Sequence, residues 1–277
     1  MQWASGIFHR LRRPEPRQQV LVQPDTTPPV PASPSPTGFC DIHTHVLYGV
    51  DDGSRDLGIS LEMLRLATEH GTTDLVASPH SDLRYRYDAD RIDAQLEELS
   101  AQMKGLIRLY RGCDFHMSFD NIRDAIRNPN KYTLNGREYL LVEFPDRAIT
   151  ANTDELLQNL ICAGMRPVIT HPERNPILRE RIEDLAEWVE SGAFIQVTAQ
   201  SFQGRFGKHA ESCSWELLRR GLVHFIASDA HDTKHRPPQL DECYRLVRSR
   251  SKPAVAEALF RTNGLAALRG EKLPVRS

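Results

Sequence analysis

Short apolar segments alternate with helical patterns from residue 39 onward, and this alternation limits the chain to a few folds. The apolar segments are rich in Val, Ile and Leu, as strands buried on both faces are. They cover residues 39–45, 73–78, 107–112, 139–144, 167–170, 194–198 and 223–228. Helical patterns lie between them at residues 57–70, 90–104, 118–127, 153–163, 182–191 and 209–220. Several end at a glycine, a common helix stop signal, and the series of β–α units predicts a parallel α/β sheet.

The boundary between a tail and the folded part is predicted at residue 38. Eight prolines lie from Pro14 to Pro36, and proline at that density prevents helix formation and strand pairing. We therefore expect residues 1–38 to be a disordered, proline-rich tail. Residues 39–277 are expected to form one domain. Its roughly 240 residues suit a closed β/α barrel, and an open doubly wound sheet is the alternative.

Composition and charge exclude several classes of protein. The chain carries a formal net charge of −2, from 35 Lys and Arg against 37 Asp and Glu, which gives no indication of nucleic-acid binding. No apolar run approaches the ~18 residues of a membrane span. With no convincing signal peptide, the expected location is cytoplasmic. Trp3 and Phe8 beside arginines indicate either a weak helix at the inner membrane surface or a frayed terminus.

The five cysteines are widely spaced and include no Cys-x-x-Cys pair. A disulfide framework or a zinc–thiolate site is therefore not expected. Free cysteine packs as a small hydrophobic residue, so we expect buried thiols.

Metal-ligand residue types stand at or just beyond the ends of six predicted strands. They are His43, His45, His80, Asp114, Glu143, His171, Asp229 and His231. Side chains alternate along a strand, so His43 and His45 point the same way. In barrels and open α/β sheets the carboxyl ends of the strands gather on one face, where active sites lie. Residues far apart in sequence are therefore expected to converge there.

Each of these residues also has an ordinary explanation when it is considered alone. A single histidine at a strand end is usually a hydrogen-bonded polar residue, and Glu143 alone could be a buried ion-pair partner. Six strand ends that all carry such residues are not expected by chance. Imidazole and carboxylate groups suit borderline or hard divalent ions. Because the candidates outnumber the four ligands of one zinc ion, two or three ions are implied.

The chain resembles a known family, the bacterial capsule and exopolysaccharide protein tyrosine phosphatases. These are manganese-dependent members of the polymerase-and-histidinol-phosphatase (PHP) superfamily. The matching motifs are Asp41-Ile42-His43-Thr44-His45, Asp51-Asp52-Gly53, Ser78-Pro79-His80, His171-Pro172-Glu173-Arg174, Ser228-Asp229-Ala230-His231 and Arg236-Pro237-Pro238. They come in family order and run from about residue 39 to 263.

The resemblance implies a distorted (β/α)7 PHP-type barrel and a site for two or three Mn²⁺ ions. The implied metal ligands are His43, His45, Asp52, His80, Asp114, Glu143, His171, Asp229 and His231. Arg174 and Arg236 are implied to bind the phosphoryl group. The implied substrate is a phosphotyrosine protein, in particular a tyrosine kinase that controls capsule synthesis. Two features depart from the family: Asp114 replaces its usual glutamate, and the tail is extra.

A thiol mechanism is the rival chemistry for tyrosine dephosphorylation. Cys213 and Arg219 match the Cys-x5-Arg spacing, but the residues between them lack glycine and fit a helix. Phosphate-binding loops need several free backbone N–H groups, which a helix interior has already used. We therefore reject this motif as a catalytic site.

Two further questions stay open from the sequence. The segment 81–87, with Arg84, Tyr85 and Arg86, is expected either to border the site and engage an acidic, tyrosine-rich peptide or to be a solvated loop. The function itself has two alternatives: a PHP phosphatase for a small phosphate ester, and an inactive scaffold bound to the kinase.

Overall fold

The structure is a computed structural model and describes residues 38–274. The tail predicted for residues 1–38 lies outside this range except for Gly38. Within the described range the fold is α/β, and every strand pair is parallel. The strands are β1 (Phe39–Thr44), β2 (Thr72–Ala77), β3 (His80–Ser81), β4 (Arg108–Arg111), β5 (Asp114–His116), β6 (Tyr139–Glu143), β7 (Arg166–Thr170), β8 (Phe194–Thr198) and β9 (Phe225–Ala227).

The strands pair in two groups, ordered β1-β2-β4 and β3-β5-β6-β7-β8-β9. Backbone hydrogen bonds join these groups at both ends. The Asp229 N–H donates to the His43 carbonyl at 2.9 Å, which ties the end of β9 to β1. On the other side the N–H of Asp114 in β5 donates to the carbonyl of Ser78, directly after β2, at 3.2 Å. As a result β3 and β5 continue the courses of β2 and β4 after short breaks.

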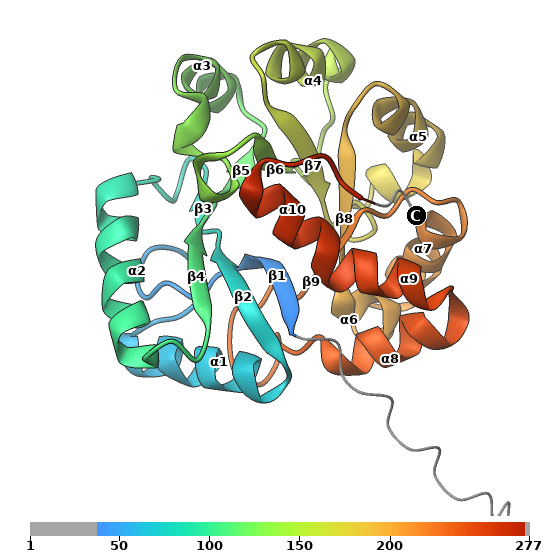
Figure 1. The fold of residues 1–277 in the computed structure, drawn as a ribbon. Coiled ribbons are helices and arrows are strands. Elements are labelled where there is room, and N and C mark those ends of the chain that lie inside the picture. The colour runs from blue at the N-terminus through green and yellow to red at the C-terminus, as the bar shows by residue number, and fades with distance from the viewer. Residues whose placement is uncertain (1–37, 275–277) are drawn as a thin grey trace, which may run out of the picture. The chain divides into compact units, whose positions relative to one another are not determined.

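The longer helices follow the strands and lie around them in the ribbon (Figure 1). They are α1 (Leu57–Glu69), α2 (Ala89–Met103), α3 (Phe119–Arg127), α4 (Thr153–Cys162), α5 (Ile182–Glu190) and α7 (Lys208–Arg219). Shorter or later elements are α6 (Ala199–Phe202), α8 (Asp241–Arg250), α9 (Pro253–Glu257), the π-helical turn η4 (Ala258–Thr262) and α10 (Asn263–Arg269). Three 3-10 turns complete the set: η1 (Pro129–Lys131), η2 (Leu134–Gly136) and η3 (Leu178–Glu180).

The core explains why the strands have continuous apolar sequences. In β6, Tyr139, Leu140, Leu141 and Val142 are all 0% exposed. Helices cover the outer face of the strands, so both faces are buried and no alternation of polar residues is needed. Single polar residues do occur inside strands, such as Asp74 in β2 and Gln196 in β8, but most of the predicted metal ligands stand at or near the carboxyl ends.

The predicted strands and helices are confirmed, with bounds that shift by one or two residues. One detail was wrong: Asp114 does not follow the third strand but begins a separate short strand, β5. The elements after residue 240 were not predicted. Of the five cysteines, four are buried as expected, but Cys162 is exposed. No helix within residues 38–274 is long and apolar enough to cross a membrane.

Candidate metal centre

The carboxyl ends of the strands bring all nine predicted ligands together. Their donor atoms form four overlapping groups, and within each group the atoms lie within 4.8 Å of one another. The groups are His45-Asp52-His80-His231, His43-Asp114-His171, His43-His45-Asp229 and His80-Asp114-Glu143. Within residues 38–274, these four groups contain the nine predicted residues and no others.

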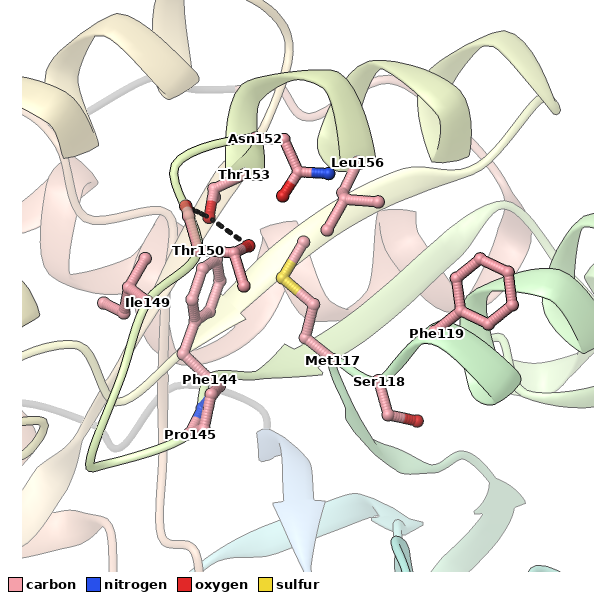
Figure 2. A pocket seen from close by; sticks show the side chains of 10 residues that line it. All are labelled: Met117, Ser118, Phe119, Phe144, Pro145, Ile149, Thr150, Asn152, Thr153 and Leu156. Carbon is pink, nitrogen blue, oxygen red and sulfur yellow. Dashed lines mark hydrogen bonds between the residues drawn. The ribbon is translucent and has the colours of Figure 1, made fainter.

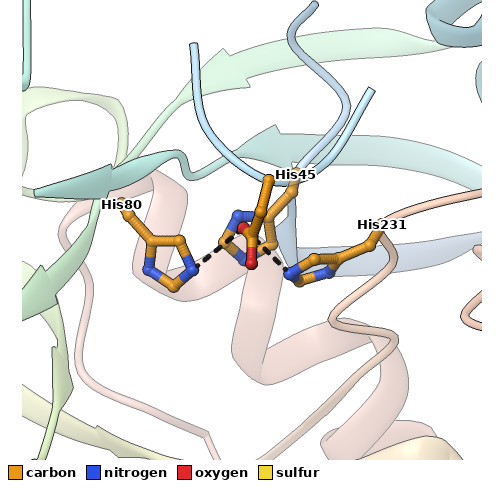
Figure 3. A group of neighbouring side chains, drawn as sticks. His45, His80 and His231 are labelled. Carbon is orange, nitrogen blue, oxygen red and sulfur yellow. Dashed lines mark ion pairs between the residues drawn. The ribbon is translucent and has the colours of Figure 1, made fainter. Parts of the chain in front are cut away.

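Three histidines and one aspartate form the group nearest to solvent. His45, His80 and His231 come from different strand ends and point toward one another (Figure 3). Asp52 Oδ1 lies 3.4 Å from His80 Nε2 and 3.5 Å from His231 Nε2. The Asp52 side chain is 45% exposed, so this group is open to solvent on one side.

Asp114 lies at the buried end of the cluster and links two groups. Its Oδ2 atom is 3.5 Å from His43 Nε2, 3.3 Å from His80 Nδ1 and 4.0 Å from His171 Nε2. Asp114 Oδ2 and His80 Nδ1 are both buried without a hydrogen-bond partner among the described residues. Unpaired buried polar atoms are costly. A cation held by both atoms would remove that cost, so the donor set fits a divalent metal site.

Asp229 connects the histidines to the two predicted phosphate-binding arginines. Its Oδ1 atom faces His43 Nε2 and His45 Nε2 at 3.5 and 3.4 Å. Its Oδ2 atom accepts hydrogen bonds from Arg174 Nη1 and Arg236 Nη2. One carboxylate therefore places a pair of guanidinium groups beside the metal-ligand side chains.

Phe206 lies against both guanidinium groups and was not identified from the sequence. The centre of its ring is 4.3 Å from Arg174 Cζ and 5.9 Å from Arg236 Cζ. A cation over an aromatic face is stabilised electrostatically and held in one plane. No sequence signal separates Phe206 from the other phenylalanines.

Three more polar residues contact the cluster and orient or extend it. The sequence alone did not assign them to the site. Gln196 Oε1 lies 2.9 Å from His43 Nδ1, and Asp51 Oδ2 lies 2.8 Å from His45 Nδ1. Such partners fix the ring orientation of metal-binding histidines. His116 Nδ1 is 3.7 Å from a Glu143 oxygen. The sequence did contain one sign of Gln196: a polar glutamine in the middle of an apolar strand indicates a specific buried partner.

The turn after His45 depends on Gly53. A Cβ atom on Gly53 would lie 2.1 Å from the His45 carbonyl oxygen, so no other residue fits without a backbone shift. The two aspartates of this turn have different partners: Asp51 contacts His45 Nδ1, and Asp52 contacts His80 and His231. The Asp-Asp-Gly motif is thus a structural requirement of the site.

Two site residues adopt left-handed backbone conformations. The φ angles are +36° for His171 and +51° for Asp229. For non-glycine residues this region costs roughly 1–3 kcal/mol and is concentrated at functional sites. The strain therefore supports a functional purpose for the loops after β7 and β9.

Burial and the neighbouring carboxylates determine the charge of the cluster. Burial alone would lower the pKa of His43, but Asp114 and Asp229 overcome that effect and raise this pKa to about 9. Burial and the nearby His45 lower the pKa of His231 to about 4. Burial opposes ionisation of Asp229, yet His43, Arg236 and Arg174 keep its pKa well below the usual range. The carboxylates are thus held ionised for cation binding.

The thiol mechanism is excluded by the position of Cys213. This residue is buried within α7, as the sequence indicated. Burial raises the pKa of its thiol to about 12, so the reactive thiolate is scarce at neutral pH.

An apolar pocket of about 250 Å³ lies beyond the β5 and β6 ends (Figure 2). Met117 and Phe144, which follow His116 and Glu143 in the chain, line it together with Ile149 and Leu156. It provides an apolar border to the cluster on this side.

The fold and the site define a parallel α/β protein with a metal site of histidines and carboxylates. The comparisons with known proteins identify its family. Residues 39–269 match the family model for capsular polysaccharide synthesis, CpsB/CapC, and the chain belongs to this family. CapC of Staphylococcus aureus is 36% identical over 239 residues, which cover 84% of this chain and 92% of CapC.

Two further likenesses agree with this assignment. The tyrosine-protein phosphatase YwqE of Bacillus subtilis is 34% identical over 208 residues, which cover 71% of this chain and 78% of YwqE. A solved structure from work on YwqE and on CpsB of Streptococcus pneumoniae superposes with a TM-score of 0.79 at 29% identity. It covers 86% of this chain and 97% of its own, and those two proteins are described as metal-dependent tyrosine phosphatases.

Proposed function

We propose that the chain is a metal-dependent protein tyrosine phosphatase that hydrolyses phosphotyrosine. One observation carries this proposal: four interlocking histidine–carboxylate groups lie beside two guanidinium groups that share Asp229. The family membership and the names of the relatives support the same activity. We further propose that the substrate is a tyrosine kinase that controls capsule or exopolysaccharide synthesis, and that the protein is cytoplasmic, either free or at the inner membrane surface.

We also propose that the strands close into a barrel. If β3 and β5 are counted with β2 and β4, the strands give seven parallel positions, and hydrogen bonds join β9 to β1. This connectivity supports a distorted (β/α)7 barrel rather than an open doubly wound sheet.

The nine residues of the four groups are the proposed ligands of two or three Mn²⁺ ions. Imidazole and carboxylate donors without thiolate suit such an ion. When bound, the ions supply Lewis-acid charge stabilisation and lower the pKa of water near phosphorus. Gln196 and Asp51 hold the His43 and His45 rings in the ligand orientation through their Nδ1 atoms.

Arg174 and Arg236 are the proposed phosphoryl-binding residues. Arg236 Nε is buried without a hydrogen-bond partner among residues 38–274, so this guanidinium has a donor left over for an anion. The planar forks match the oxygen geometry of a phosphoryl group. A phenolate with a pKa of ~10 leaves with little protonation, so the site needs no strong general acid for phosphotyrosine.

Manganese-dependent hydrolysis of a phosphotyrosine peptide is the expected result of the direct test. We expect turnover with Mn²⁺, near-complete loss with a chelator, and recovery when the ion is restored. Histidinol phosphate and a nucleotide serve as comparison substrates and should be poorer. Preference for a small ester would favour the small-molecule alternative. Undetectable hydrolysis at full manganese occupancy would favour an inactive scaffold instead.

Asp114→Ala is expected to weaken metal binding by at least about a hundredfold, since even outer partners of ligands contribute that much. Asp114 Oδ2 faces three histidine rings, so two groups lose a donor. Titration with Mn²⁺ and metal analysis measure the effect. Asp93→Ala, which removes a surface carboxylate paired with Arg111, is the control. Unchanged affinity and stoichiometry in Asp114→Ala would remove this residue from the ligand set.

A further inference from the structure

A small basic pocket shares a wall with the metal centre. It has a volume of about 200 Å³, and its lining includes His80, Arg86, Arg91 and Ile92. His80 is also a member of two metal-ligand groups. Any group that enters this pocket therefore lies against one of the proposed metal ligands.

The segment that forms the outer side of the pocket is anchored against the site. The Tyr85 ring stacks on the His80 ring, with centroids 5.9 Å apart and planes inclined by 16°. Asp82 Oδ1 accepts hydrogen bonds from the backbone N–H groups of Arg84 and Tyr85 at 2.7 Å each. Of the segment 81–87, Ser81 ends β3 and the rest is a loop, but Tyr87 is buried and Tyr85 stacks on His80, so the segment borders the site as the other alternative expected.

Arg86 is the residue in this pocket with unused binding capacity. No hydrogen bond, ion pair or ring contact involves its guanidinium within residues 38–274. Arg91 also lines the pocket, and one of its amino groups donates to the Gly49 carbonyl at 2.8 Å. The one acidic side chain in the lining, Asp88, accepts the Arg91 backbone N–H at 3.2 Å as the N-cap of α2. The balance of charge in the pocket is therefore positive.

We propose that this pocket is a specificity subsite for an anionic side chain of the substrate, close in sequence to the phosphotyrosine. Two guanidinium groups in a small recess bind a carboxylate or a second phosphate by charge-assisted hydrogen bonds. Histidinol phosphate carries no second anionic group, so the subsite favours an acidic peptide over that small ester. This inference rests on the proposed phosphatase function. It adds a preference for an acidic residue near the target tyrosine in the substrate sequence.

Matched phosphotyrosine peptides test the subsite on the full chain with Mn²⁺. Each peptide carries one glutamate, glutamine or phosphoserine at one of three positions on either side of the phosphotyrosine. We expect kcat/KM to be about tenfold higher for glutamate than for glutamine at one or two positions. The phosphoserine series shows whether a second phosphate is preferred to a carboxylate. Equal values for glutamate and glutamine at every position would overturn the proposal.

Two variants separate local binding from general attraction. Arg86→Gln should reduce the glutamate-to-glutamine ratio to about one. Arg84→Gln is the matched control, because Arg84 lies over the outer Tyr85 ring at 5.2 Å and does not line the pocket. An equal effect of both variants would indicate long-range steering and contradict the subsite. Hydrolysis of all peptides without preference contradicts only this inference, whereas no hydrolysis of any peptide contradicts the proposed function as well.

Discussion

His43→Ala is expected to lower phosphotyrosine turnover by about a thousandfold or more and to reduce the amount of bound metal. His43 belongs to two of the four ligand groups, so its removal weakens two positions at once. Divalent ions contribute several kcal/mol of charge stabilisation to such reactions, and each ~1.36 kcal/mol corresponds to a factor of ten in rate. Turnover with saturating Mn²⁺ and metal analysis of the purified protein measure the two effects.

The controls for this variant separate chemistry from folding. His43 is 0% exposed, so circular dichroism and a thermal melt must show that the variant folds. Asp51→Asn is the graded comparison, because Asp51 orients His45 but belongs to no ligand group. We expect it to lose about tenfold to a hundredfold. Wild-type turnover of a folded His43→Ala protein at equal metal concentration would refute the site.

The sequence predicts the convergence of distant residues because parallel strands share one carboxyl edge. His43, Glu143 and Asp229 are 186 positions apart from first to last, yet strand periodicity and topology alone place them at one end. Helix ends are also well predicted, since a glycine follows α1, α4, α5 and α7 within two residues. These features depend on local chemistry and on one general rule of topology.

Other parts of the site depend on contacts that no local pattern encodes. The short strands β3 and β5 come after Pro79 and Gly112. These residues interrupt the apolar runs by which a strand is recognised in a sequence, so the two strands were not predicted. Phe206 reaches the arginines from a loop after α6, and no periodicity predicts the path of that loop. Asp51 and Asp52 are neighbours in sequence with different partners, and only the turn at Gly53 separates their roles.

Arg236→Lys is expected to reduce kcat/KM for a phosphotyrosine peptide by about a hundredfold. Lysine keeps the charge but loses the planar fork that holds a phosphoryl group at two points. The substitution also removes one of the two guanidinium groups that donate to Asp229 Oδ2, so that only Arg174 remains. Removal of one preorganised donor to a transition-state oxygen costs about a hundredfold to a thousandfold in comparable sites. Steady-state kinetics give the values.

Two further variants determine how this result is interpreted. Arg220→Lys keeps the charge opposite Glu183 at the surface but removes the two-pronged hydrogen bonding, and it should leave turnover unchanged. Cys213→Ser should also be fully active, because that thiol lies buried in α7. If Arg236→Lys matched wild type in both kcat and KM, Arg236 would be a structural partner of Asp229 only. A folded but inactive Cys213→Ser protein would instead restore the thiol mechanism, so the three variants together separate metal-assisted chemistry from its rival.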